Sequence, residues 1–168
     1  MNRRCNSIKK IISHEKQINK KIKMCIRDRG TSSLKQRIQA VNEMCEAGYP
    51  CGLLIAPVIL VDDWKKLYTE LLEELESGLS VKMKREMFLE IILMTYSYVH
   101  RAINQDAFPG AEDLYDQERM TGRGRGRYCY RPEARAEAEN FLRAEIKRIL
   151  GDVQILYIRD VYKRQVHH

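Results

Sequence analysis

The residues best suited to chemistry lie in one arginine- and glycine-rich strip, Thr121–Tyr130. Arg123, Arg125 and Arg127 alternate with glycines, and Tyr128 follows directly. A guanidinium pairs with a phosphate through two parallel hydrogen bonds, and glycine lets the backbone come close to a ligand. A tyrosine ring offers a flat surface for an unstacked base. The residue types and their spacing therefore predict nucleic-acid contact through these three arginines and this tyrosine.

The same strip has a plainer interpretation, a solvated loop whose arginines contact nothing specific. A bare Gly-Arg repeat favours the loop, whereas the adjoining aromatic residue Tyr128 favours binding. Chemistry on a base also requires that the base leave the stack, at a cost of roughly a few kcal/mol. A strip of this composition is therefore suited to wedge into a duplex beside a displaced base.

The elements that must position this strip alternate between helix and strand, which is typical of an α/β fold. Residues 51–56 show no polar alternation, as expected for a strand of a parallel sheet covered on both faces. Gly48 and Gly78 follow apolar residues at helical spacing and mark helix ends. The expected elements are helix 34–48, strand 51–56, helix 64–78 capped by Asp62 or Asp63, strand 87–95, helix 96–104, a helical piece 111–120, helix 132–149 and strand 153–158.

The amino-acid sequence of these elements resembles that of spore photoproduct lyase, the radical S-adenosylmethionine DNA-repair enzyme of spore-forming bacteria. The resemblance covers roughly residues 33–158. It rests on Arg-Ile-Gln-Ala-Val-Asn at 37–42, Glu-Ala-Gly-Tyr at 46–49, Ala-Pro-Val-Ile at 56–59 followed by an acidic pair and Trp64, Glu90–Thr95, Gly122–Tyr130 and Val153–Ile158. It is most specific at Arg127 and Tyr128, where the family places a hairpin that engages the DNA lesion.

This resemblance implies the carboxyl-terminal half of a radical S-adenosylmethionine barrel, that is, an α/β partial (β/α) barrel with an Arg/Gly-rich hairpin. The resembling block has about 130 residues, whereas a complete barrel takes about 250. Reactive groups of such barrels gather where strands end and loops begin. Ala56 and Thr95 stand at such positions, and the resemblance implies that they help to bind S-adenosylmethionine.

The chemistry of the family also needs a 4Fe-4S cluster, which cysteines hold in a Cys-x-x-x-Cys-x-x-Cys run. The five cysteines of this chain, Cys5, Cys25, Cys45, Cys51 and Cys129, form no such run. We therefore expect no catalytic residue and no metal ligand here, so that the chain alone is inactive and keeps only a positioning role.

The partners that the resemblance implies are DNA containing spore photoproduct and the missing amino-terminal half of the same enzyme. No run in the chain approaches the ~20 apolar residues that cross a bilayer. We therefore expect no membrane partner and a cytoplasmic location.

The peptides at both ends of the resembling block are encoded by two reading frames of one nucleotide string. The string GATGTGTATAAGAGACAG encodes residues 160–165 in one frame. Shifted by one base, it encodes residues 24–28 and then the first two bases of a codon for Arg29 or Ser. It resembles the transposon mosaic end used in sequencing libraries. We therefore predict that residues 1–29 are a foreign or unrelated flank, residues 30–159 the lyase-like block and residues 160–168 a foreign tail. The rival interpretation is that two real peptides happen to match the string.

The excess positive charge behind the net charge of +7 lies almost entirely in residues 1–29. Residues 1–29 hold ten Lys or Arg against two acids, whereas residues 30–159 hold 18 against 20. A basic chain ordinarily suggests nucleic acid or an acidic membrane surface, but the excess here lies in the flank. Within residues 30–159 the notable positive charge is a local concentration of arginines, at positions 119, 123, 125, 127, 131 and 135.

Two other classes of function stay open. A nucleic-acid-binding module without catalysis would use the same arginines but would not bind S-adenosylmethionine. A non-functional structural fragment would bind neither ligand, and it would aggregate through an uncovered sheet edge.

Overall fold

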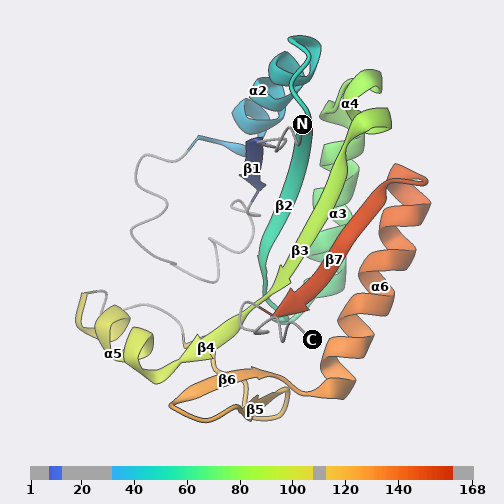
Figure 1. Cartoon of the computed structure of the whole chain (residues 1–168). Helices are drawn as coiled ribbons and strands as arrows, with labels where there is room; N and C mark the ends of the chain where they lie inside the picture. Colours follow the sequence, from blue (N-terminus) through green and yellow to red (C-terminus); the bar gives the residue numbers. More distant parts are fainter. Residues whose placement is uncertain (1–7, 13–31, 108–112, 161–168) are drawn as a thin grey trace, which may run out of the picture.

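The structure is a computed structural model that describes residues 8–12, 32–107 and 113–160. A four-stranded sheet forms its centre, and a three-stranded sheet lies beyond one end of it (Figure 1). In chain order the elements are β1 (Ile8–Ile12), α2 (Leu34–Glu46), β2 (Cys51–Val58), α3 (Trp64–Gly78), α4 (Val81–Glu86), β3 (Phe88–Leu93), β4 (Thr95–Ser97), α5 (Tyr98–Ala107), β5 (Met120–Gly122), β6 (Arg127–Tyr130), α6 (Pro132–Leu150) and β7 (Gln154–Asp160).

The strands of the larger sheet are all parallel, in the order β1-β2-β3-β7. Leu89, Ile91 and Leu93 of the inner strand β3 are completely buried, as expected for a strand with neighbours on both sides and helices above it. Because parallel strands end at the same edge, β3 and β7 both point toward the small sheet (Figure 1).

Helices α3 and α6 lie side by side along the larger sheet (Figure 1). Each has one apolar stripe, and burying it is the main gain of packing. The buried residues are Trp64, Tyr68, Leu71, Leu72 and Leu75 in α3 and Ala138, Leu142, Ile146 and Leu150 in α6. The rings of Trp64 and Phe141 meet edge to face with centroids 5.0 Å apart. Because α6 begins directly after β6, this packing ties the small sheet to the larger one.

The small sheet is antiparallel, in the order β4-β6-β5. Strands β5 and β6 form a hairpin that contains the arginine-glycine strip, so the predicted hairpin is confirmed. The mixed α/β fold is also confirmed. The described strands form no closed barrel, and the partial barrel stays a prediction.

The helical piece predicted over residues 111–120 is wrong for its described part. Residues 113–116 are irregular, residues 117–119 form a turn, and Met120 begins β5. The Asp116 carboxylate accepts hydrogen bonds from the backbone N–H groups of Glu118 and Arg119, both at 2.9 Å. Aspartate side chains that bind nearby backbone N–H groups favour turns over helix. The prediction of a helix did not consider this competition.

Three smaller differences concern the ends of elements. The strand predicted over residues 87–95 is divided into β3 and β4, and the second piece carries Tyr96 and Ser97 away from the predicted helix. Asp63 stands at the N-cap of α3, but its side chain makes no capping hydrogen bond. The short helix α4 was not predicted.

Strand β1 lies within residues 1–29, which we predicted to be foreign to the block. Its backbone pairs in parallel with β2, from Ile8 beside Cys51 to Ile12 beside Ile55. Deletion of residues 1–29 therefore tests the predicted amino-terminal boundary of the block.

Candidate nucleic-acid interface

The turn of the β5–β6 hairpin explains the alternating glycines. Gly124, Arg125 and Gly126 have φ angles of 82°, 53° and 68°. Glycine adopts this left-handed region without steric cost, whereas other residues adopt it rarely. The Arg123 N–H donates to the Arg127 carbonyl at 2.8 Å and closes the turn. The glycines thus serve the turn, which holds Arg125 at the tip of the hairpin.

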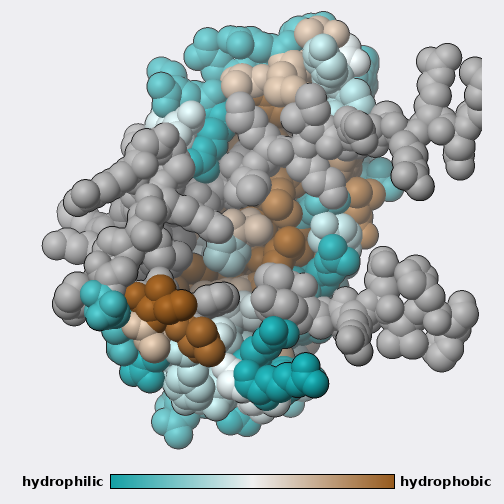
Figure 2. All heavy atoms as spheres, turned by 60° about the vertical axis from the view of Figure 1, so that its left-hand side comes forward, coloured by the Kyte–Doolittle hydropathy of each residue, from teal (hydrophilic) through white to brown (hydrophobic). Residues whose placement is uncertain are grey.

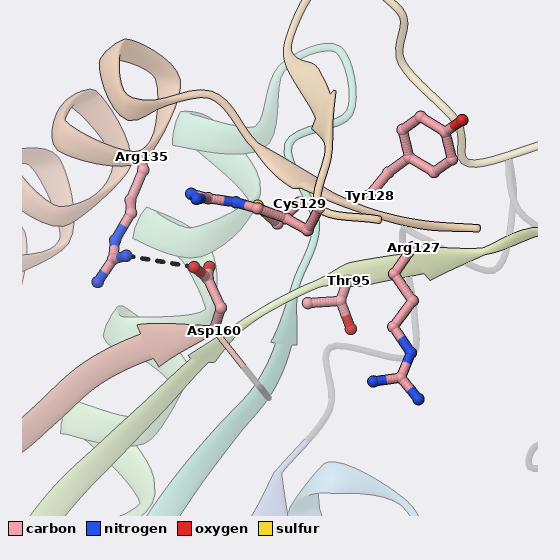
Figure 3. Close-up of a pocket in the computed structure, with 7 residues that line it drawn as sticks. Thr95, Arg127, Tyr128, Cys129, Arg135 and Asp160 are labelled. Carbon is pink, nitrogen blue, oxygen red and sulfur yellow. Dashed lines mark hydrogen bonds and ion pairs between the residues drawn. The ribbon is translucent and has the colours of Figure 1, made fainter. Parts of the chain in front are cut away.

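Neighbouring residues of β6 point to opposite faces of the small sheet, as in any strand. Arg127 and Cys129 share one face with Thr95, which is the register partner of Cys129. Tyr128 shares the other face with its register partner Tyr96. Figure 3 shows the side chains of Arg127 and Tyr128 directed away from each other. The two side chains therefore point to opposite sides of β6, although Tyr128 is also one of the residues that line the cavity on the Arg127 side.

The surface on the Tyr128 side is a cluster of four tyrosines, Tyr96, Tyr98, Tyr115 and Tyr128. The Tyr128 ring meets Tyr98 and Tyr115 edge to face, with centroids 5.1 and 5.0 Å apart. A hydrogen bond with Tyr98, and then partial burial, raise the pKa of the Tyr128 phenol. The Tyr96 hydroxyl donates to the Asp113 carboxylate at 2.8 Å. The cluster thus presents an aromatic surface beside the hairpin.

The surface on the Arg127 side is a cavity of about 340 Å³ at the end of the larger sheet (Figure 3). Its lining comes from β4, from the hairpin, from the first turn of α6 and from the end of β7. The lining residues are Thr95, Arg123, Arg127, Tyr128, Cys129, Arg135 and Asp160. With three guanidinium groups against one carboxylate, this lining favours an anion.

Two interactions fix arginines in this cavity. The Arg123 Nε donates to the Cys129 sulfur at 2.8 Å, which orients the Arg123 guanidinium along the hairpin. The Arg135 Nη1 pairs with the Asp160 Oδ2 at 3.2 Å (Figure 3). Both arginines are therefore held by contacts within the protein.

The hairpin is anchored to the loop after β2 through both backbone groups of Leu60. The Leu60 N–H donates to the Tyr130 hydroxyl at 2.9 Å, and the Leu60 carbonyl accepts from Arg119 at 2.5 Å. The neighbouring Ile59 N–H donates to the Tyr68 hydroxyl of α3 at 2.8 Å. Burial raises the pKa of both phenols above the usual range. These two tyrosines thus join the hairpin, the loop and α3.

Four of the six predicted site residues meet around the cavity: Thr95, Arg123, Arg127 and Tyr128. Arg125 lies in the turn and does not line it. Ala56 lies in β2, where its bond to Pro57 is cis, and it is not among the lining residues either. The placement of the four residues is a structural finding, whereas their roles, and those of Arg125 and Ala56, stay predictions.

Sequence reasoning missed the residues that complete and hold the site. Arg135 was noted among the crowded arginines but was not assigned to a site, and Asp160 was set aside with the tail. Tyr68 and Tyr130 were not singled out, because a buried tyrosine that accepts from a backbone amide has no sequence signal. Their partners are distant in the chain and meet them only in the fold.

The described residues do not fit an iron-sulfur cluster. They contain no group of three or more His, Cys, Asp or Glu side chains that could hold a metal ion. The described cysteines, Cys45, Cys51 and Cys129, are buried single thiols. No helix in the described part of the chain is long and apolar enough to span a membrane.

The fold and the site define a mixed α/β protein with an arginine-lined cavity at the carboxyl ends of parallel strands. The profile of the family described as "Spore photoproduct lyase" matches residues 10–159. The chain belongs to this family. The match begins within the predicted foreign flank, in β1, and ends one residue before Asp160.

Curated relatives agree with this assignment. The chain is 30% identical over 132 residues to the spore photoproduct lyase of Geobacillus sp. (strain Y412MC61), which covers 76% of this chain and 39% of the relative. It is 26% identical to the spore photoproduct lyase of Bacillus subtilis (strain 168), with the same coverage. The chain thus spans about 39% of the length of these relatives.

Solved structures show the same partial match. A mutant spore photoproduct lyase with bound AdoMet and dinucleoside spore photoproduct aligns with a TM-score of 0.70 and 26% identity. The alignment covers 77% of this chain and 39% of that protein. A spore photoproduct lyase complexed with dinucleoside spore photoproduct aligns equally well.

Proposed function

We propose that this chain is the DNA-positioning part of a spore photoproduct lyase, an enzyme that repairs the spore-type thymine dimer in DNA by adenosyl-radical chemistry. The arginine-lined cavity beside the hairpin carries the proposal, because three guanidinium groups there suit a phosphate backbone. Family membership adds the substrate class, since related structures hold dinucleoside spore photoproduct. A DNA substrate is consistent with a cytoplasmic location.

The two faces of β6 suggest how the hairpin would engage a lesion. Arg127 faces the cavity and would contact phosphate, whereas Tyr128 faces the tyrosine cluster and would contact a base. A strand with these two faces could act as a wedge, because it offers an aromatic surface to a base that has left the stack and guanidinium groups to the neighbouring phosphates.

The other half of the enzyme would supply the cluster and its chemistry. In the intact family, S-adenosylmethionine and the 4Fe-4S cluster supply the adenosyl radical that attacks the lesion. The described residues contain no group of side chains that could hold a metal ion. In this proposal the chain contributes orientation and charge. Thr95, in the cavity, and Ala56, near the end of β2, are our proposed contacts to S-adenosylmethionine.

The partial barrel belongs to the same proposal. Four parallel strands with helices packed against them are the elements from which such a barrel is built, which supports the proposal. The missing amino-terminal half would supply the remaining strands. DNA binding without catalysis is the second candidate function for this chain alone, favoured by the lack of cluster ligands among the described residues.

The test is DNA binding by fluorescence anisotropy, with undamaged and spore-photoproduct-containing duplexes over a series of salt concentrations. Arg127→Ala should weaken binding to both duplexes alike and lower the salt slope by about 1, because one phosphate contact is lost. Tyr128→Ala should mainly remove the preference for the damaged duplex. Arg148→Ala, at the far end of α6, is the control for loss of one positive charge.

The outcomes separate the two candidates. Equal loss of affinity for both duplexes with Arg127→Ala, without any lesion preference in the unaltered chain, would support simple nucleic-acid binding. If Arg127→Ala and Tyr128→Ala both bind like Arg148→Ala, the hairpin is no DNA contact and the proposal is wrong.

A further inference from the structure

Arg135 lines the cavity from a different element than the hairpin arginines. It lies in the first turn of α6, whereas Arg123 and Arg127 belong to the hairpin. In Figure 3, Arg135 and Arg127 lie on opposite sides of Thr95. An anion held by Arg135 would therefore be a different one from the anion held by Arg127.

The present partner of Arg135 is the Asp160 carboxylate, which lies in the cavity wall. The Arg135 side chain is 22% exposed and that of Asp160 is 10% exposed. The second carboxylate oxygen, Oδ1, is buried and has no hydrogen-bond partner among the described residues. An unsatisfied buried acceptor is unfavourable, so the carboxylate is imperfectly accommodated where it stands.

Asp160 also acts on Arg123. The pKa of Arg123 is raised mainly by its contact with Cys129, and the charge of Asp160 contributes a smaller part. One negative group thus lies in the same cavity as guanidinium groups from two separate elements, which favours an anion between the hairpin and α6.

We propose that Arg135 and Arg123 together hold one backbone phosphate of bound DNA in this cavity, in competition with the Asp160 carboxylate for Arg135. This inference rests on the proposed function. A carboxylate and a phosphate present similar oxygen pairs to a guanidinium, so the ion pair indicates the direction from which a phosphate would be bound.

Two further observations favour phosphate as the ligand. The cavity of about 340 Å³ is at the small end of ligand pockets, which range over ~300–1,000 Å³, and suits one group of a larger ligand. The family match ends at Arg159, one residue before Asp160. Its carboxylate competes with DNA for Arg135.

The experiment compares Arg135→Gln, Asp160→Ala and the double variant in the full chain, with Arg148→Gln as the control on the same helix. Arg148 lies 13 residues further along α6, roughly 20 Å away at 1.5 Å per residue. The readout is anisotropy of a fluorescent undamaged duplex over a salt series. The lysine-rich residues 1–29 are common to all variants, so differences in slope report the substituted site.

Arg135→Gln should weaken binding roughly tenfold at ~0.1 M salt and lower the salt slope by about 1, whereas Arg148→Gln should do neither. Asp160→Ala should strengthen binding several-fold and steepen the slope. The double variant should lose this gain, because Asp160 acts through Arg135.

A second readout uses inorganic phosphate alone. Phosphate should raise the melting temperature of Asp160→Ala, whose Arg135 lacks a partner, more than that of the double variant. Weaker DNA binding by Asp160→Ala than by the unaltered chain would overturn the inference, as would an Arg135→Gln variant that matches Arg148→Gln. If Arg127→Ala still lowers the slope in that case, the proposed function stands and only the Arg135 site fails.

Discussion

Tyr130→Phe should show whether the hairpin is held by its hydrogen bond to the loop after β2. The substitution removes one oxygen atom and leaves the ring in place. The Leu60 N–H, now 2.9 Å from the Tyr130 hydroxyl, would lose its acceptor in a site where both residues are buried. An unsatisfied buried donor costs about 1–3 kcal/mol, and we expect the free energy of unfolding to fall by that amount.

Tyr68→Phe is the matched control. Its hydroxyl accepts from the adjacent Ile59 N–H at 2.8 Å, but Tyr68 belongs to α3 and not to the hairpin. Both variants should therefore lose similar stability in urea unfolding, with unchanged m values. Only Tyr130→Phe should also weaken DNA binding below the unfolding transition, because it alone frees the hairpin from Leu60.

Two results would refute this reasoning. If the free energy of unfolding of Tyr130→Phe lies within about 0.5 kcal/mol of that of the unaltered chain, the hydroxyl does not satisfy the Leu60 amide. A difference of about 0.5 kcal/mol is no larger than that of neutral surface substitutions. If both variants weaken DNA binding equally, the effect follows from lower stability and not from the anchoring of the hairpin.

The remaining predictions concern alkaline pH and the flank. Burial raises the pKa of Tyr68 and Tyr130 in the folded chain above the ordinary value of about 10. The folded chain thus keeps protons that the unfolded chain loses, so this stability is present below pH ~10 and is lost above it, by up to about 1.4 kcal/mol per pH unit for each tyrosine. Tyr68→Phe should flatten this fall in urea titrations at several pH values, and an unchanged slope would contradict it. Deleting residues 1–29 should leave the melting temperature unchanged or raised if that flank is foreign, whereas loss of cooperative unfolding would show that β1 is needed beside β2.

How much of the fold the sequence predicts depends on the range of the interactions involved. The apolar stripes of α3 and α6 and the unbroken apolar strand β2 are local patterns, and they predicted these elements correctly. The segment before β5 was mistaken for a helix because Asp116 binds nearby N–H groups, and a count of apolar spacing ignores such competition. Strand β1 was not predicted because its residues were set aside on other grounds.

Prediction of the candidate site from the sequence is limited in the same way. The sequence identified Arg123, Arg127 and Tyr128 because they are neighbours in one strip. It did not show that Thr95 pairs with Cys129 across two strands, or that Arg135 enters the same cavity from α6. Those placements depend on sheet register and on the packing of α6 against α3, which bring together residues that are distant in sequence.

The alternation of β6 decides what kind of binding site the strip makes. Read along the sequence, Arg127 and Tyr128 are adjacent and suggest one contact to one nucleotide. In the folded strand they lie on opposite faces, with guanidinium groups gathered on one side and tyrosine rings on the other. If DNA binds here, phosphate and base must therefore lie on opposite sides of the same strand, a geometry that a stacked duplex does not offer. We therefore expect the hairpin to prefer a nucleotide that has left the stack over regular duplex. This preference should disappear in Tyr128→Ala, whereas the salt dependence should remain with the arginines.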